Sequence, residues 1–282
     1  MEIVRRVHSM KEISRQNRSR GLRIGFVPTM GYLHDGHIAL IRKMNELADV
    51  VVLSIFVNPT QFGPDEDFHS YPRDLAHDAD LCTAEGVEYL FIPEADELYP
   101  PGPQAWVEVP DLSGQLEGAS RPGHFRGVAT VVLKLFHIVN PSIAAFGEKD
   151  AQQLLVVQRM VRDLCLDIEI VAVPTVRDAD GLALSSRNDY LNEEERAAAT
   201  AIPRALELAR SMMLEERISP ERILEAVRGT LEDEPLTRID YVQLVHPDTL
   251  EPVAGIEGEM RLVLAVFCGE TRLLDNELLR RG

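Results

Sequence analysis

The chain has 282 residues, of which 45% are hydrophobic and 27% charged, the ordinary composition of a globular protein with a sizeable core. Its formal net charge of −17 disfavours a large nucleic-acid interface, which needs a clustered basic face. No apolar stretch approaches the ~20 residues of a membrane span, and the N-terminus lacks a signal-peptide core. Cys82, Cys165 and Cys268 lie far apart and are odd in number, which favours a reduced, cytoplasmic protein over a disulfide or zinc framework.

Short apolar strands alternate with helical segments through the first part of the chain. The capping-box spacing of Ser9 and Glu12 predicts a short helix before the first strand. Five strands alternating with helices predict an α/β protein with a Rossmann-like, doubly wound parallel sheet. The sequence has neither G-x-G-x-x-G after a strand nor a P-loop, so neither fingerprint is supported. The strands are expected at 23–27, 50–57, 88–92, 143–146 and 168–173, and the helices at 38–48, 73–85, 123–139 and 151–164.

The chain changes character at Pro174, which predicts a domain of residues 1–175 followed by a smaller α+β domain of residues 176–282. The capping box at Asn192 starts a helix to about residue 213, with a kink expected at Pro203. Ser219 and Pro220 start a further helix. Strands are expected at 241–245 and 261–266.

The first βα turn, residues 28–37, carries the pattern His-x-Gly-His at the start of a helix. Helix starts present backbone N–H groups and partial positive charge, so they suit phosphate. His34 and His37 are three residues apart and project from one face, and Gly36 would let a ligand approach the backbone. The alternative is that both histidines merely cap and fill the turn.

Polar residues also follow other predicted strands. Asn58 and Gln61 follow the second, and Lys149 follows the fourth and precedes a helix, which favours a phosphate contact. Ser185, Ser186 and Arg187 offer hydroxyl donors beside a charge. The competing interpretations are a solvated loop for Gln61, a solvent-facing Lys149 and a capping segment for 185–187. His124 and Arg126, at the start of a helix, form a weaker candidate anion site.

In this order, these segments closely resemble the pantoate–β-alanine ligase (pantothenate synthetase) family, within the His-x-Gly-His nucleotidylyltransferase superfamily. The resemblance covers nearly the whole chain. One departure is Ala151, where the family commonly has an aromatic residue; it should change local packing more than chemistry. The matching strings are PTMGYLHDGH, FVNPTQF, YPRDL, RPGHFRGVATVV, FGEKDAQQL and GLALSSRN.

The resemblance implies an AMP-forming carbon–nitrogen ligase of pantothenate (coenzyme A precursor) biosynthesis. It would condense (R)-pantoate with β-alanine through a pantoyl-adenylate and release AMP and pyrophosphate. Mg²⁺ would accompany the substrate ATP. Its protein ligands are unknown: Asp78 is conceivable, but a solvated position on the helix surface is favoured. A homodimer in the cytoplasm, with neither nucleic-acid nor membrane partners, is also implied.

The family's functional residues transfer to the matching positions of this chain. His37 would donate a proton, His34 and Lys149 would contact phosphates, and Gln61 and Gln153 would hold pantoate. The smaller domain would close over the ATP site through residues 185–187. The implied ATP-binding set is Met30, Gly31, Tyr32, Leu33, His34, Asp35, Gly36, His37, Gly147, Glu148, Lys149, Asp150, Val176, Leu184, Ser185, Ser186 and Arg187.

Three rival functions remain open from the sequence. A nucleotidylyltransferase would transfer AMP to a phosphate acceptor and stop there. A class I aminoacyl-tRNA synthetase fragment fits less well, because the chain is short and acidic. A non-catalytic nucleotide-binding module is disfavoured by the retention of both histidines, Lys149 and residues 185–187.

Overall fold

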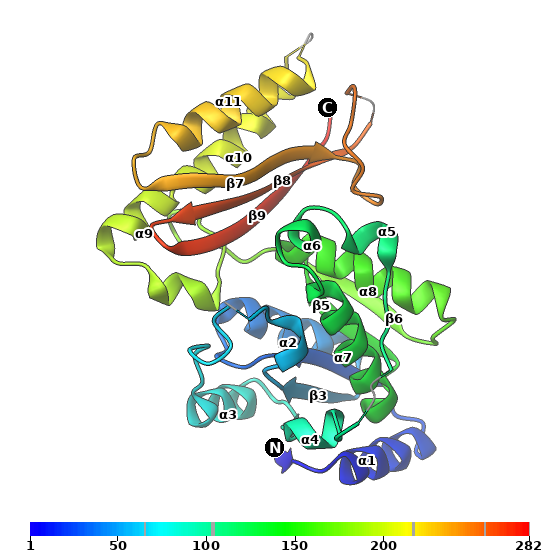
Figure 1. Cartoon of the computed structure of the whole chain (residues 1–282). Coiled ribbons are helices and arrows are strands. Elements are labelled where there is room, and N and C mark those ends of the chain that lie inside the picture. Colours follow the sequence, from blue (N-terminus) through cyan, green and yellow to red (C-terminus); the bar gives the residue numbers. More distant parts are fainter. Residues whose placement is uncertain (65, 103–104, 216–217, 257, 282) are drawn as a thin grey trace. The chain divides into compact units, whose positions relative to one another are not determined.

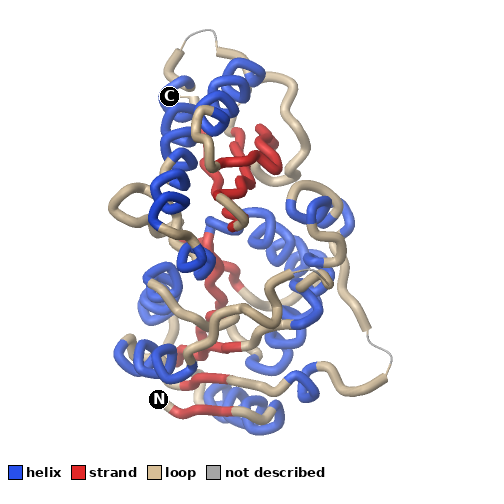
Figure 2. Tube along the Cα trace, turned by 60° about the vertical axis from the view of Figure 1, so that its left-hand side comes forward, coloured by secondary structure: helices blue, strands red, loops and turns tan. Residues whose placement is uncertain are grey.

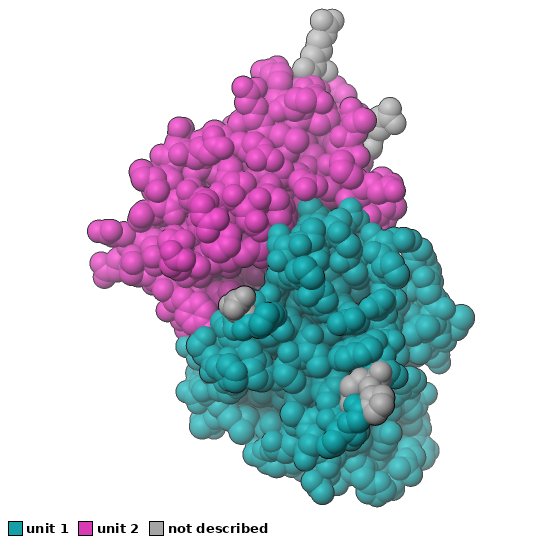
Figure 3. All heavy atoms as spheres, viewed as in Figure 1, with its two compact units in different colours: residues 1–148, 152–174 teal, residues 149–151, 175–282 magenta. Residues whose placement is uncertain are grey.

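The computed structural model describes residues 1–64, 66–102, 105–215, 218–256 and 258–281. These residues form two compact units, coloured separately in Figure 3. Unit 1 contains Met1–Glu148 and Gln152–Pro174, and unit 2 contains Lys149–Ala151 and Thr175–Gly282. None of the described helices is both long and apolar enough to cross a membrane.

Unit 1 is built on a parallel sheet, whose described strands have the order β1-β4-β3-β2-β5-β6 (Figure 1). The predicted doubly wound parallel sheet is confirmed. The prediction missed the edge strand β1, because three residues are too few to show a period. The strands are β1 Glu2–Val4, β2 Ile24–Thr29, β3 Val50–Ile55, β4 Tyr89–Phe91, β5 Ile143–Gly147 and β6 Glu169–Val173.

Helices cover both faces of this sheet (Figure 2). Successive side chains of β2 alternate between the faces: Phe26 meets Phe136 of α7 with ring centroids 6.3 Å apart, whereas Val27 shares a core cluster with Ile41 and Met44 of α2. The helical segments are α1 Val7–Ser19, α2 Asp35–Leu47, η1 Pro59–Gln61, α3 Leu75–Ala84, α4 Ala95–Leu98, α5 Pro110–Ser113, α6 Glu117–Ser120, α7 His124–Val139, η2 Glu148–Asp150 and α8 Ala151–Asp163.

Two expectations for unit 1 need correction. The first helix was expected to begin at Ser9, but α1 begins at Val7 after Arg6, which provides no side-chain cap. The elements expected from the sequence include no helix between residues 93 and 122, yet the described part of this segment contains the short helices α4, α5 and α6. Each has four residues, too few for an apolar periodicity to mark it in the sequence.

Unit 2 packs helices on an antiparallel sheet of order β7-β8-β9. The expected strands are there but longer, and β9 was missed because Asp275 and Asn276 interrupt its apolar pattern. The expected kink is a break at Thr200, because Pro203 lacks an N–H and its ring clashes with the carbonyl of Ala199. The elements are η3 Ser186–Tyr190, α9 Glu193–Ala199, α10 Ala201–Met212, α11 Pro220–Glu232, β7 Thr237–Val245, β8 Met260–Cys268 and β9 Thr271–Leu279.

The topology identifies an edge of the unit 1 sheet where ligands bind in open α/β proteins. The chain adds β3 and β4 on one side of β2, then returns to add β5 and β6 on the other. The strand order therefore reverses between β2 and β5, and the crevice at the carboxyl ends of such strands is the usual ligand site. Residues after Thr29 and after Gly147 begin at this edge.

Candidate active site

His34 and His37 form a reciprocal capping box at the start of α2. Nδ1 of His34 accepts the backbone N–H of Gly36 at 3.1 Å, and Nδ1 of His37 accepts the backbone N–H of His34 at 3.2 Å. The two ring centroids are 4.1 Å apart. Because a backbone N–H can only donate, both Nδ1 atoms are unprotonated, and each neutral imidazole carries its proton on Nε2.

This geometry corrects one detail expected for the turn. The backbone N–H groups of His34 and Gly36 are used in capping, so they are not available to a phosphate. A Cβ on Gly36 would lie 2.8 Å from Cε1 of His34, so this glycine makes room for the His34 ring. The alternative interpretation, that both histidines cap the turn, is therefore correct for their Nδ1 atoms. An anion at this helix start would be contacted by imidazole Nε2–H groups.

Asp78 supports the preceding loop from α3. Its side chain is 1% exposed, and its carboxylate accepts the backbone N–H groups of Tyr32 at 2.9 Å and Leu33 at 2.7 Å. Burial raises the pKa of Asp78, and these hydrogen bonds act in the opposite direction. The expectation of a solvated helix-surface residue is wrong. The signal was present: Asp78 stands one helical turn before Cys82, on the inward face of α3.

Gln61 is buried beside the turn, and Asn58 fixes the orientation of its amide. Asn58 Nδ2 donates to the Gly127 carbonyl at 3.2 Å, and its Oδ1 accepts from Thr60, so its own orientation is settled. The same Nδ2 donates to Gln61 Oε1 at 3.2 Å, which turns Gln61 Nε2 toward Met30 Sδ, 2.9 Å away. Gln61 thus presents a donor, and the solvated-loop alternative is wrong.

The paired glutamines of α8 have different roles. Gln152 is buried and uses both ends of its amide: Nε2 donates to the carbonyls of Leu112 and Gln115, and Oε1 accepts from Glu117 N–H. Gln153 is half-buried and makes no side-chain hydrogen bond to the described residues. Gln152 is therefore occupied in holding α5 and α6, and Gln153 remains the candidate ligand.

His124 and Arg126 do not form the anion site considered from the sequence. Nδ1 of His124 donates to the Gln61 carbonyl at 2.8 Å, and burial lowers the pKa of His124 to about 4, so the ring is neutral near pH 7. Arg126 is exposed, 3.6 Å from Glu108 and stacked over Trp106. Neither side chain provides an unopposed positive charge.

In unit 2, β9 holds the Lys149 segment. Asn276 Nδ2 donates to the Lys149 carbonyl at 2.9 Å. Asn276 is buried, and its Oδ1 accepts from Arg261 at 2.5 Å. The Lys149 side chain is 18% exposed, with Nζ 3.7 Å from Asp150. The solvent-facing alternative for Lys149 therefore does not hold.

The neighbouring residue of β9 holds a second predicted segment. Asp275, 3% exposed, forms a bidentate ion pair with Arg177 at 2.6 and 3.0 Å. Arg177 also donates to the Gly181 carbonyl at 3.1 Å, and the Leu184 N–H donates to the Val176 carbonyl at 3.0 Å. These bonds close the turn 176–184 that leads into Ser185, whose Oγ caps η3 by accepting the Arg187 N–H at 3.3 Å.

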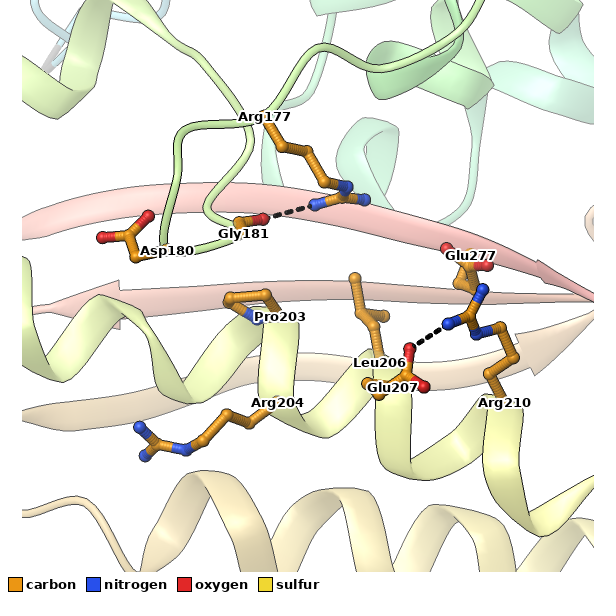
Figure 4. A pocket seen from close by; sticks show the side chains of 9 residues that line it. All are labelled: Arg177, Asp180, Gly181, Pro203, Arg204, Leu206, Glu207, Arg210 and Glu277. Carbon is orange, nitrogen blue, oxygen red and sulfur yellow. Dashed lines mark hydrogen bonds and ion pairs between the residues drawn. The ribbon is translucent and has the colours of Figure 1, made fainter.

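A hollow of about 520 Å³ opens within unit 2 (Figure 4). Much of its charged lining is already paired: Arg177 with Asp275, Arg210 with Glu207 at 2.5 Å, and Asp180 with Arg196 at 2.6 Å. The first pair joins the turn to β9 and the third joins it to α9, whereas the second lies within α10. The lining residues are Arg177, Asp180, Gly181, Pro203, Arg204, Leu206, Glu207, Arg210 and Glu277.

The parallel sheet, whose strand order reverses between β2 and β5, defines an open α/β protein, a class that binds ligands at the carboxyl ends of such strands. The Pantoate-beta-alanine ligase family model matches residues 2–278. The chain belongs to the pantoate-beta-alanine ligase family, and it is a ligase.

Individual relatives agree with this assignment. The chain is 50% identical to pantothenate synthetase of Caldicellulosiruptor saccharolyticus, with 98% of each chain covered. The crystal structure of pantothenate synthetase from Thermus thermophilus superposes with a TM-score of 0.92 at 47% identity, covering 98% of this chain and 99% of that one. Pantoate-beta-alanine ligase from Francisella tularensis, complexed with beta-gamma ATP and beta-alanine, gives 0.82 at 35% identity, covering 99% and 97%.

Proposed function

We propose that the protein condenses (R)-pantoate with β-alanine at the expense of ATP, releasing AMP and pyrophosphate. The observation that carries this proposal is the pair His34 and His37, whose ring centroids are 4.1 Å apart and whose tautomers carry Nε2–H, at the point where the strand order reverses. The nucleotide and β-alanine named for the Francisella tularensis relative support the same substrates here.

The chemistry requires two steps, because a carboxylate is a poor acyl electrophile. A pantoate carboxylate oxygen attacks the α-phosphorus of ATP, and pyrophosphate leaves to give pantoyl-adenylate. The neutral amine of β-alanine then attacks the acyl carbon, AMP leaves with the bonding electron pair, and the nitrogen loses a proton. Negative charge builds on phosphate oxygens in the first step, where aligned donors of the oxyanion-hole type contribute roughly 3–4 kcal/mol each.

The donors proposed for that charge are the residues that the family resemblance assigns to the phosphates. His37 and His34 would donate Nε2–H to phosphate oxygens, and Lys149 would add a full positive charge. Ser185, Ser186 and Arg187 would contact the triphosphate, as the family resemblance implies. The rest of the predicted ATP-binding set keeps the role given to it from the sequence, including Gly147, Glu148 and Asp150.

Gln61 and Gln153 are proposed to hold pantoate. The orientation imposed by Asn58 makes Gln61 a donor, which suits the carboxylate or a hydroxyl oxygen of the acid. Equal loss of ATP and pantoate affinity in Gln61→Ala and Gln153→Ala would contradict this assignment, since each amide should serve the acid alone.

Mg²⁺ is expected to arrive with ATP. Asp78 does not fit as its ligand, because the carboxylate is buried and both oxygens accept backbone N–H groups. Among the described residues, no cluster of three His, Cys, Asp or Glu side chains is arranged to hold a metal ion. The ion would therefore be bound largely by phosphate oxygens and would neutralise part of their charge. The implied homodimer and cytoplasmic location stay predictions.

The test is incubation of the protein with ATP, Mg²⁺, pantoate and β-alanine, followed by mass-spectrometric identification of the products. Pantothenate, AMP and pyrophosphate are expected in equal amounts. A stable dinucleotide would instead identify a nucleotidylyltransferase, and no product would identify a binding module. Without β-alanine, positional isotope exchange in ATP should require pantoate; its absence during full turnover would point to a concerted route.

A further inference from the structure

A relay of polar side chains leads from Glu66 to the main chain of Gln61. Arg121 binds Glu66 through two hydrogen bonds, at 2.8 Å from Nε and 2.5 Å from Nη2. Arg121 Nη1 lies 3.3 Å from His124 Nε2, and His124 Nδ1 lies 2.8 Å from the Gln61 carbonyl oxygen. Each member is therefore oriented by the one before it.

The direction of every bond in the relay is fixed. A carbonyl can only accept, so His124 Nδ1 carries the proton and donates it to Gln61. A guanidinium can only donate, so the unprotonated Nε2 of His124 accepts from Arg121. Burial, followed by the charge of Arg121, lowers the pKa of His124 to about 4. The ring is thus a neutral donor whose tautomer Arg121 selects.

The relay acts on a backbone with little room to move. A Cβ on Gly127 would lie 2.4 Å from the Thr60 carbonyl oxygen, so the first turn of α7 packs directly against η1. Asn58 Nδ2 also donates to the Gly127 carbonyl. The Gln61 amide is thereby held by Asn58, and the Gln61 carbonyl is held by His124 and Arg121.

We propose that Glu66, Arg121 and His124 are positioning residues for Gln61, and that the affinity for the acid substrate depends on them. This inference rests on the proposed role of Gln61. The relay keeps the η1 backbone at the angle that aims the Gln61 donor. Its three side chains bond to one another and to the Gln61 carbonyl, whereas the predicted ATP-binding set is met through Met30, whose Sδ the Gln61 amide contacts. Loss of the relay should therefore weaken binding of the acid more than binding of ATP.

Substitutions of His124 test the relay by donor position. Asn places an N–H close to the position of Nδ1, whereas Gln places one near Nε2. His124→Ala and His124→Gln should raise the KM for pantoate about 10- to 100-fold, the range for removal of one partner from a buried hydrogen bond. His124→Asn should restore it to within about threefold. The KM for ATP should stay within about twofold throughout. His137→Ala, on the exposed end of α7, is the matched control.

A double-mutant cycle separates positioning from general loss of structure. In a Gln61→Ala background, His124→Ala should add less than about twofold to the pantoate KM, since the group it aims is gone. Glu66→Gln and Arg121→Lys should give intermediate increases, because each keeps part of the relay. Thermal unfolding of every variant identifies those that fail to fold.

The outcomes are distinct. A wild-type protein that makes no pantothenate contradicts the proposed function itself. If the wild type is active, three results overturn the relay: additive effects of His124→Ala and Gln61→Ala, equal behaviour of His124→Asn and His124→Gln, or equal increases in the KM values of ATP and pantoate.

Discussion

The segments that carry most of the predicted phosphate contacts are held in two different ways. The His34–His37 turn largely supports itself, because its capping bonds join residues two or three apart. The Lys149 segment and the turn at Arg177 depend on Asn276 and Asp275, which are 127 and 98 residues away in the chain. The first site should therefore survive changes elsewhere, whereas the second should fail when β9 is altered.

We expect the largest effect from substitutions of His34, because its ring both caps α2 and is proposed to contact a phosphate. Asn is a good N-cap, so His34→Asn should keep the free energy of unfolding while losing the imidazole donor. We expect kcat/KM to fall about 10²- to 10³-fold, as for loss of one hydrogen-bond donor to developing negative charge. His34→Ala should lose as much activity and, in addition, about 1 kcal/mol of stability. Urea unfolding and steady-state kinetics of both variants would test this; an active His34→Asn protein would mean that the ring only caps.

The turn at Arg177 should lose stability when its distant partner on β9 is replaced. Asp275→Asn leaves Arg177 without its buried counter-charge, and breaking such a pair typically costs about 3–5 kcal/mol. Asp240→Asn, on β7 at the other edge of the sheet, removes the less buried pair with Arg272 and should cost below about 1 kcal/mol. Urea denaturation compares the two variants. Equal stabilities would show that β9 does not hold the Arg177 turn.

The third prediction concerns how the stability contributed by His124, the histidine of the Gln61 relay, depends on pH. The pKa of His124 is about 4 in the folded protein against an ordinary 6.5, so between these values the unfolded chain binds the additional proton. Stability from this group is complete above pH 6.5 and is lost as the pH falls towards 4. The 2.5-unit difference corresponds to about 3 kcal/mol.

His124→Asn should flatten this pH dependence, which urea unfolding between pH 7 and 4.5 would measure. Glu66 faces the same ring, and the pKa of its carboxyl is lowered from 4.5. Burial is the largest single influence and opposes the shift, but the hydrogen bond and charge of Arg121, with smaller contributions from His124 and the Gly63 backbone, together outweigh it. The stability contributed by Glu66 is therefore lost at a lower pH than the stability contributed by His124. An unchanged slope in His124→Asn would assign the loss to other groups.

The same contrast explains what the sequence could predict. Apolar runs located the strands β2 to β6, and capping residues located α9 and α11 at Asn192 and Ser219, because these signals lie within a few residues of each other. The His34–His37 turn was visible for the same reason. The strand β9 was not, since the buried Asp275 and Asn276 read as loop residues until their partners are known.

Long-range partners also account for what was missed at the candidate site. The sequence was enough to identify Gln61 and Lys149 as candidates. It was not enough for Arg121, Glu66 or Asn276, because local sequence does not indicate which distant side chain will donate to a given backbone carbonyl. Asp78 shows the intermediate case. Its place on the inward face of α3 indicated burial, but its backbone partners at Tyr32 and Leu33 follow only from the fold.

Asp78 also tests how far the His34–His37 turn is self-supporting. Both carboxylate oxygens of Asp78 accept backbone N–H groups of the loop before α2, whereas an amide has one accepting oxygen. Asp78→Asn should therefore leave one buried N–H facing an NH₂ group, with a loss of about 1–3 kcal/mol. Relief from burying a charge offsets part of this loss, because burial raises the pKa of the carboxyl. Asp80→Asn, exposed on the same helix, is the control. If the turn depends on this support, Asp78→Asn should lower kcat/KM along with stability, and the fall should exceed that of Asp80→Asn. Unchanged kinetics would show that the capping box alone holds the two rings in place, because the loop would then have lost a support without moving them.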